Sequence, residues 1–151
     1  MPQSYSAVAI HIVFATKSRH PYLFDSELRQ EMHAYIGGAL KALGCPPIAV
    51  GGVADHVHIL AKLGRPVAIS DCVREIKKAS TSWAHDREQQ LANFSWQSGF
   101  AVFSVSPSAL SAKKLYVANQ EEHHRKLTFE EEFRALLEEH GIEFDEKNRW
   151  E

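Results

Sequence analysis

Apolar residues with a two-residue period or in continuous runs predict four β-strands. Residues 4–16 are mostly apolar and β-branched, which is typical of a buried strand. Residues 48–53 and 56–62 read as two strands with a tight connection, which predicts a β-hairpin. Residues 99–105 form a fourth apolar run. The chain therefore carries enough strands for one sheet.

Four other segments carry apolar residues at helical spacing. Each begins after a residue that can cap a helix, and the expected N-caps are Asp25, Ser70, Ser106 and Thr128. Glu131 follows Thr128 by three positions, which is the capping-box pattern. Gly44 and Gly141 follow the first and last helices and are expected to end them. The third helix would carry both Tyr116 and Gln120.

The order of these elements is β-α-β-β-α-β-α, followed by a C-terminal helix. The first six match the split βαβ arrangement, so we expect an α+β, ferredoxin-like fold with an antiparallel sheet. Helices would cover one face of this sheet and leave the other face or an edge free. The tyrosine-bearing helix and a last short helix would follow. No repeat or linker interrupts the chain, so we expect one domain over residues 1–151.

Composition limits the class of protein. A hydrophobic content of 44% and a charged content of 24% are ordinary for a soluble globular protein. No apolar run approaches membrane-spanning length, and no signal-peptide pattern opens the chain. Cys45 and Cys72 are isolated, so we expect reduced thiols and a cytoplasmic protein. The net charge of −2 counts against a nucleic-acid binder, although binding needs only a local basic face.

Two pairs of residues carry the candidate chemistry. His56 and His58 are separated by one apolar residue, so in a strand both would point to one face and could bind one divalent metal. Tyr116 and Gln120 are four apart and share a face in a helix. The alternatives are structural: hydrogen-bonded histidines, a packing tyrosine and an exposed glutamine. Asp55, before the histidines, is expected to be a turn residue.

Three segments resemble a known family when they are read together and in order. They are His11-Ile-Val-Phe-Ala-Thr-Lys17, Asp55-His-Val-His58 and Tyr116-Val-Ala-Asn-Gln-Glu-Glu-His-His-Arg125. They resemble the single-tyrosine HUH transposases of small insertion sequences, which include the REP-associated tyrosine transposases. The resemblance covers nearly the whole chain.

The resemblance implies a fold, an activity and a set of site residues. The implied fold is the ferredoxin-like one, usually as a homodimer. Tyr116 would attack a DNA phosphate and form a 5′-phosphotyrosine, while His56, His58 and Gln120 would hold Mg²⁺ or Mn²⁺. The partner would be single-stranded DNA, at hairpin ends of a mobile element.

Basic residues could contact DNA phosphates away from this site. The candidates are Lys17, Arg19, Arg74, Lys77 and Lys78. A solvated surface is the alternative for each of them. His123 and His124 continue the tyrosine helix, and we interpret them as surface residues of a charged helix end.

Two other functions remain open at this stage. A domesticated relative could bind hairpin DNA without moving it. A small metallohydrolase could use His56 and His58 with a carboxylate, but the sequence shows no carboxylate clearly placed for that role. Replacement of Tyr116 by phenylalanine separates the three possibilities.

Overall fold

The computed structural model describes residues 3–145 and contains one four-stranded antiparallel sheet. The strands are β1 (Ala9–Ala15), β2 (Pro47–Val53), β3 (His56–Lys62) and β4 (Ala101–Val105). Their order across the sheet is β2-β3-β1-β4. This order is that of the split βαβ arrangement, so the expected α+β, ferredoxin-like fold is confirmed. The first strand is shorter than the expected 4–16.

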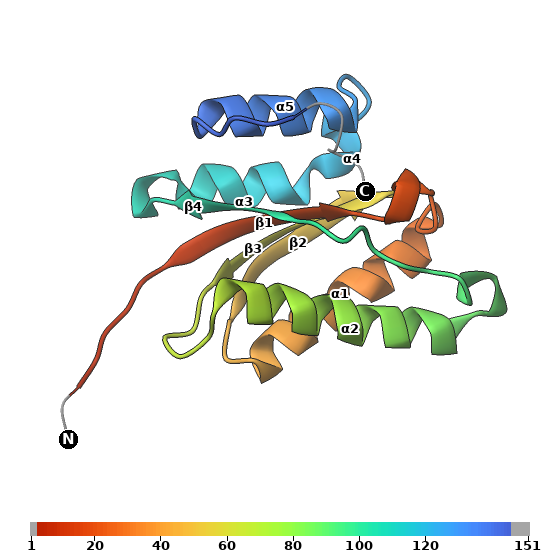
Figure 1. The fold of residues 1–151 in the computed structure, drawn as a ribbon, viewed down its shortest axis with the longest axis horizontal. Helices are drawn as coiled ribbons and strands as arrows, with labels where there is room; N and C mark the ends of the chain where they lie inside the picture. The colour runs from red at the N-terminus through yellow and green to blue at the C-terminus, as the bar shows by residue number, and fades with distance from the viewer. Residues whose placement is uncertain (1–2, 146–151) are drawn as a thin grey trace.

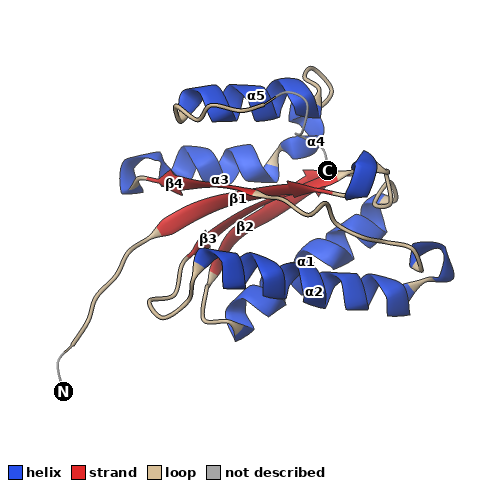
Figure 2. Cartoon of the chain, in the orientation of Figure 1, coloured by secondary structure: helices blue, strands red, loops and turns tan. Residues whose placement is uncertain are grey.

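Helices cover both faces of the sheet (Figures 1 and 2). They are α1 (Ser26–Ala42), α2 (Ile69–Arg87), α3 (Leu110–Ala118), α4 (Gln120–His123) and α5 (Phe129–Glu139). Short 3-10 turns are η1 (Lys17–Arg19), η2 (Gln89–Leu91) and η3 (Pro107–Ala109). In Figure 1, α1 and α2 lie below the sheet and α3, α4 and α5 lie above it. The sheet face that the sequence left open is therefore covered by the C-terminal helices.

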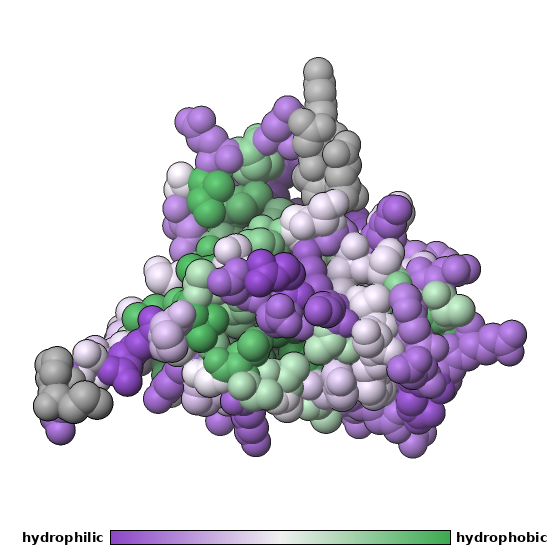
Figure 3. All heavy atoms as spheres, turned by 60° about the horizontal axis from the view of Figure 1, so that its bottom comes forward, coloured by the Kyte–Doolittle hydropathy of each residue, from purple (hydrophilic) through white to green (hydrophobic). Residues whose placement is uncertain are grey.

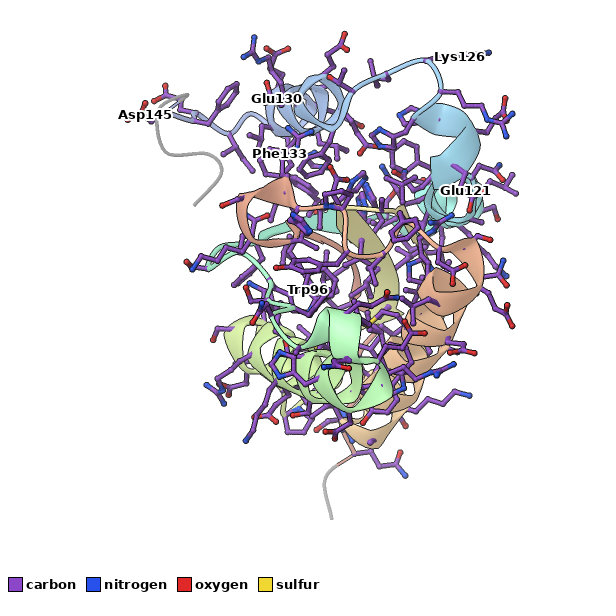
Figure 4. The ribbon with its side chains drawn as sticks, turned by 90° about the vertical axis from the view of Figure 1, so that its right-hand side faces the viewer. Trp96, Glu121, Lys126, Glu130, Phe133 and Asp145 are labelled. Atoms are coloured by element: carbon purple, nitrogen blue, oxygen red, sulfur yellow. The ribbon has the colours of Figure 1, made fainter. Side chains whose placement is uncertain are left out.

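The two faces of the sheet have separate cores. Because side chains alternate along a strand, neighbouring residues of β1 and β3 enter different cores. The larger core, against α1 and α2, includes Ile12, Phe14 and Ile59. The opposite face packs smaller clusters, whose buried members are Val13, Ala15, Leu60, Phe103, Val105, Val117, Phe129, Leu136 and Leu137. Figure 4 shows Phe133 on the side of α5 that faces the sheet and Trp96 on the other side of the sheet.

Local signals explain most helix boundaries. The Asp25 carboxylate accepts a hydrogen bond from the Glu27 amide at the start of α1. The capping box of Thr128 and Glu131 forms at the start of α5. Gly44 and Gly141 both adopt a positive φ, of 77° and 66°, just after α1 and α5. Ser70 does not cap α2, since that helix already begins at Ile69.

The proline after Ser106 opens the 3-10 turn η3, and α3 begins only at Leu110.

Among residues 3–145, no helix combines the length and the apolar character that crossing a bilayer requires. Figure 3 shows one face of the molecule, with hydrophilic side chains over much of its outline and hydrophobic residues mainly in its left-hand half.

Candidate metal and nucleophile site

The middle of the sheet presents the two histidines of β3 to the side that α3 and α5 cover. His56 and His58 are completely buried. The Nδ1 atom of His56 lies 2.8 Å from Oδ1 of Asp55. The Nδ1 atom of His58 lies 2.8 Å from Nε2 of His11 on β1. These partners fix both rings so that each directs Nε2 toward the same space under α5.

Tyr116 and Gln120 enter this space from α3 and α4. The sequence predicts one helix for both, but the chain bends at Asn119, whose φ and ψ are −101° and 29°. Gln120 stays at the site despite this bend, and its side-chain amide donates a hydrogen bond to the Tyr116 carbonyl at 3.2 Å. The Gln120 Oε1 atom lies 3.4 Å from Nε2 of His56. The structure therefore brings all four predicted residues together.

A close approach between backbones holds the tyrosine helix on the sheet. Gly51 of β2 is the register partner of His58. A Cβ atom at Gly51 would lie 2.0 Å from the Val117 carbonyl oxygen. Since no side chain fits that space, glycine is what allows α3 to lie directly on β2. Tyr116 precedes Val117, so this contact also fixes how far Tyr116 lies from β2, the strand that pairs with β3.

The centre of the site is a carboxylate that the sequence reading missed. Glu132 of α5 is buried, with 1% of its surface exposed. Its Oε1 lies 2.9 Å from Nε2 of His58 and 3.0 Å from Nε2 of His124. Its Oε2 accepts a hydrogen bond from the Tyr116 hydroxyl. One carboxylate thus joins the histidines to the candidate nucleophile.

The interpretation of His124 as a surface residue is wrong. Its side chain is 10% exposed, because the chain turns after α4 and directs the ring into the site. His123, 33% exposed, lies closer to solvent, with Nε2 3.4 Å from Oε2 of Glu132. A signal for Glu132 exists in the sequence: it shares the apolar stripe of α5 with Phe129 and Leu136. A carboxylate on such a stripe is buried and needs partners.

Burial and hydrogen bonding shift the pKa values of the cluster in different directions. Burial lowers the pKa of His58 to about 4, and that of His11 to about 2. Burial acts the same way on His56, but hydrogen bonds to Asp55 and Glu132 outweigh it and raise its pKa. Burial would raise the pKa of Glu132, but hydrogen bonds from the surrounding histidines hold it well below its usual range. The carboxylate is therefore ionised.

The environment of Tyr116, the candidate nucleophile, disfavours its ionised form. Burial, and then the negative charge of Glu132, raise the pKa of the Tyr116 phenol above its usual value. A phenol in this state does not ionise at neutral pH. A cation bound beside Glu132 would oppose that effect, because it would favour the tyrosinate.

The residues could hold a divalent metal. One ligand atom from each of His56, His58, His124 and Glu132 lies within 4.8 Å of the others. Neutral imidazole and carboxylate are common ligands of transition metals, and the Gln120 oxygen adds a neutral donor beside them. The donor set fits a metal without rearrangement of the sheet.

Arg19 lies near the rim of the site. Its guanidinium contacts the Asp55 carboxylate at 3.5 Å and the Glu130 carboxylate at 3.1 Å. It therefore ties the turn before β3 to the first turn of α5. Lys17 is exposed on the same 3-10 turn.

The three basic candidates of α2 belong to a helix that covers the opposite face of the sheet from α3 and α5 (Figure 1). Arg74 pairs with Asp71 at 3.0 Å and contacts Glu75 at 3.7 Å. Lys77 donates to the carbonyls of Gln97 and Gly99 at 2.8 and 2.9 Å, and burial lowers its pKa to about 8. Lys78 is exposed. Their contact with DNA remains a prediction.

Comparison with known proteins places the chain in a family. The family model described as "Transposase IS200 like" matches residues 4–120. A crystal structure of a Deinococcus radiodurans R1 protein assigned as a transposase has a TM-score of 0.59 and 24% identity, over 80% of this chain and 96% of that one. A REP-associated tyrosine transposase bound to a REP hairpin has a TM-score of 0.55 and 18% identity, over 78% of this chain and 68% of that one.

The two solved structures share the fold of this chain at low sequence identity, and no curated protein matches it. The family model supplies the stronger finding, since it spans more than half of the chain and includes the histidine pair, Tyr116 and Gln120. The chain belongs to the IS200-like transposase family.

Proposed function

We propose that this transposase cleaves and rejoins single-stranded DNA through a covalent bond to Tyr116. The observation that carries the proposal is the shared carboxylate: Glu132 accepts the Tyr116 hydroxyl with one oxygen and contacts the His58 imidazole with the other. The hydroxyl is thereby held beside side chains that could bind a metal. This geometry is what attack on a metal-bound phosphate requires.

The proposed step is an in-line displacement at phosphorus. Tyr116 Oη forms the new P–O bond and releases its proton along the hydrogen bond to Glu132. The 3′ oxygen leaves with the electrons of the broken P–O bond and takes a proton from water to become a 3′-hydroxyl, so a 5′-phosphotyrosine remains. The reverse attack by a 3′-hydroxyl restores the phosphodiester and the phenol. A divalent metal at the histidines, Mg²⁺ or Mn²⁺, would supply Lewis-acid stabilisation of the phosphate charge.

The same cluster imposes a condition on access. His56, His58, Gln120 and Glu132 are each at most 1% exposed, whereas Tyr116 is only partly buried. Part of Tyr116 is therefore open to solvent, but a phosphate cannot reach the histidines unless α5 shifts. We infer that binding of DNA shifts α5 enough to admit the phosphate while Glu132 keeps its contact with Tyr116.

The proposed partner is a DNA hairpin, which the REP-bound relative supports. A homodimer is also proposed, although one chain already brings Tyr116 and the histidines together. Size-exclusion chromatography with light scattering tests the dimer. It would show twice the chain mass for the free protein.

The test of the proposed chemistry is covalent capture. Purified protein is incubated with a pool of end-labelled single-stranded hairpins and Mn²⁺ or Mg²⁺, then separated on a denaturing gel. We expect a protein–DNA adduct that is lost with EDTA and in Tyr116→Phe. Tyr35→Phe is the matched control, since Tyr35 is 41% exposed and packs on Trp83 away from the site.

Two outcomes would refute the proposal. Hairpin binding without any adduct would identify a binding protein that no longer moves DNA. Hydrolysis that survives in Tyr116→Phe would identify a metallohydrolase. The latter gains weight from Glu132, because the structure supplies the carboxylate that the sequence did not reveal.

A further inference from the structure

Three imidazoles surround one carboxylate oxygen beneath α5. The Nε2 atoms of His58, His124 and His56 lie 2.9, 3.0 and 3.6 Å from Oε1 of Glu132. His56, His58 and Glu132 are at most 1% exposed. Two of these residues come from β3, one follows α4 and one lies on α5. Separate elements of the fold thus bring these side chains to one buried position.

The hydrogen bonds on the far side of the rings determine which nitrogen carries the proton. His56 Nδ1 lies 2.8 Å from Oδ1 of Asp55, and His124 Nδ1 lies 2.8 Å from the Leu127 carbonyl oxygen. Both partners are acceptors only, so each ring donates from Nδ1. A neutral ring that donates from Nδ1 presents an unprotonated lone pair at Nε2. These two lone pairs face the Glu132 carboxylate.

Lone pairs that face a carboxylate oxygen repel one another unless a positive charge lies between them. One divalent cation would satisfy all four donors at once. In a tetrahedral zinc-type site, ligand atoms about 2.1 Å from the metal lie about 3.4 Å from one another. The three separations of 2.9–3.6 Å between Nε2 and Oε1 bracket that spacing.

We propose that His124 and Glu132 complete a four-ligand metal site with His56 and His58 in the DNA-free protein. The ligand set is rich in imidazole, so the site would take a divalent transition metal such as Mn²⁺ or Zn²⁺ in preference to Mg²⁺. Gln120 Oε1, 3.4 Å from Nε2 of His56, lies next to these ligands. The proposal deepens the proposed function and rests on it only for the use made of the metal.

The second oxygen of Glu132 gives the site a further role. It accepts the Tyr116 hydroxyl, so the same residue would hold the metal and position the nucleophile. Lys113, whose Nζ lies 4.8 Å from the centre of the Tyr116 ring, packs against the ring itself. Glu132 is then a positioning residue for Tyr116 as well as a metal ligand.

The experiment measures metal binding without DNA. The full chain is stripped with EDTA, desalted and titrated with MnCl2, and free Mn²⁺ is counted from its electron paramagnetic resonance signal. We expect one Mn²⁺ for each chain. The affinity should fall at least about tenfold in Glu132→Gln and in His124→Gln. MgCl2 should displace the bound Mn²⁺ only at large excess, and ZnCl2 should displace it readily.

Two control variants change the same residue types elsewhere. Glu138→Gln alters an exposed carboxylate on α5, and His20→Gln alters an exposed histidine next to η1. Both should bind Mn²⁺ within twofold of the native chain. Circular dichroism and thermal unfolding show whether Glu132→Gln is folded. If it is not, His124→Gln provides the test, since it leaves the buried Glu132 carboxylate in place.

Unchanged Mn²⁺ affinity in both Glu132→Gln and His124→Gln would overturn the proposal, above all if His56→Gln abolishes binding. That result would leave a site made only by β3 and Gln120. Absence of Mn²⁺ and Zn²⁺ binding to the native chain would also overturn it. A chain that binds metal through all four ligands but forms no DNA adduct would refute the proposed function and leave this inference standing.

Discussion

Gly51→Ala is the sharpest test of how the tyrosine helix is held. The added Cβ would meet the Val117 carbonyl oxygen at 2.0 Å and the Val117 carbonyl carbon at 3.0 Å. Ordinary van der Waals contact begins near 3.4 Å, so α3 must move by about 1.4 Å, or β2 must deform by a similar amount. Both neighbours are backbone atoms, which cannot swing aside as a flexible side chain would.

The expected consequences follow from that displacement. Overpacking of this kind costs about 1–3 kcal/mol of stability. For a chain of this size, that lowers the Tm by about 3–10 °C. A shift of about 1 Å at the Tyr116 hydroxyl should reduce the rate of adduct formation by about a hundredfold. Hairpin binding should persist, because the substitution changes no charge.

The assay compares Tm, Mn²⁺ affinity and the initial rate of adduct formation. Gly38→Ala is the matched control: no atom lies within 4 Å of its added Cβ, and alanine in the middle of α1 should raise stability by about 0.5–1 kcal/mol. Retained Mn²⁺ affinity together with a slower rate in Gly51→Ala would show that Tyr116 has moved and the residues of β3 have not. Native Tm together with a native rate would refute the reasoning, since α3 could not then lie on β2 as described.

Three further predictions concern other contacts. In EDTA the protein should lose stability as the pH falls from 7 to 5, because His11 and His58 have pKa values of about 2 and 4 when folded and about 6.5 when unfolded. Each of these two histidines should contribute about 2 kcal/mol to that loss, and His56 should offset part of it because its pKa is raised in the folded protein. An unchanged urea midpoint at the two pH values would contradict the argument. Lys77→Met should lower the Tm by removing hydrogen bonds to the carbonyls of residues 97–99, whereas Lys78→Met should not; a change in the salt dependence of hairpin binding without a change in Tm would instead assign Lys77 to DNA contact. Thr128→Ala should lower the free energy of unfolding by about 1 kcal/mol and speed amide exchange in residues 129–139 relative to β1. Equal exchange in the native chain and in Thr128→Ala would show that the cap does not hold α5.

The period-2 and helical patterns predicted the elements and half of the site. His56 and His58 face one side because strand residues alternate, and Tyr116 and Gln120 converge despite the bend at Asn119. Those relations are local, so a sequence can carry them. The order of the strands could be predicted only from the split βαβ arrangement of elements, because pairing between distant strands leaves no local pattern in the sequence.

The remainder of the site depends on how the end of the chain folds back. Glu132 and His124 reach the histidines only because α5 returns across the second face of the sheet, more than 60 residues after β3. No spacing rule predicts that return. The apolar stripe of α5 did indicate that one side is buried, and Glu132 on that stripe was the clue. The bend at Asn119 has neither glycine nor proline to signal it.

The place of β3 in the sheet has a consequence for how the site is assembled during folding. β3 is hydrogen-bonded on both sides, to β2 and β1, so His56 and His58 belong to the part of the chain that opens least often. Tyr116 and Glu132 lie on helices at the end of the described chain, whose cores are small and which open at lower cost. The donor set is therefore complete only after the last helix has docked. A partly folded chain, or one still missing α5 during synthesis, holds the histidines but lacks Glu132 beside Tyr116, so the proposed strand cleavage would be confined to the finished molecule.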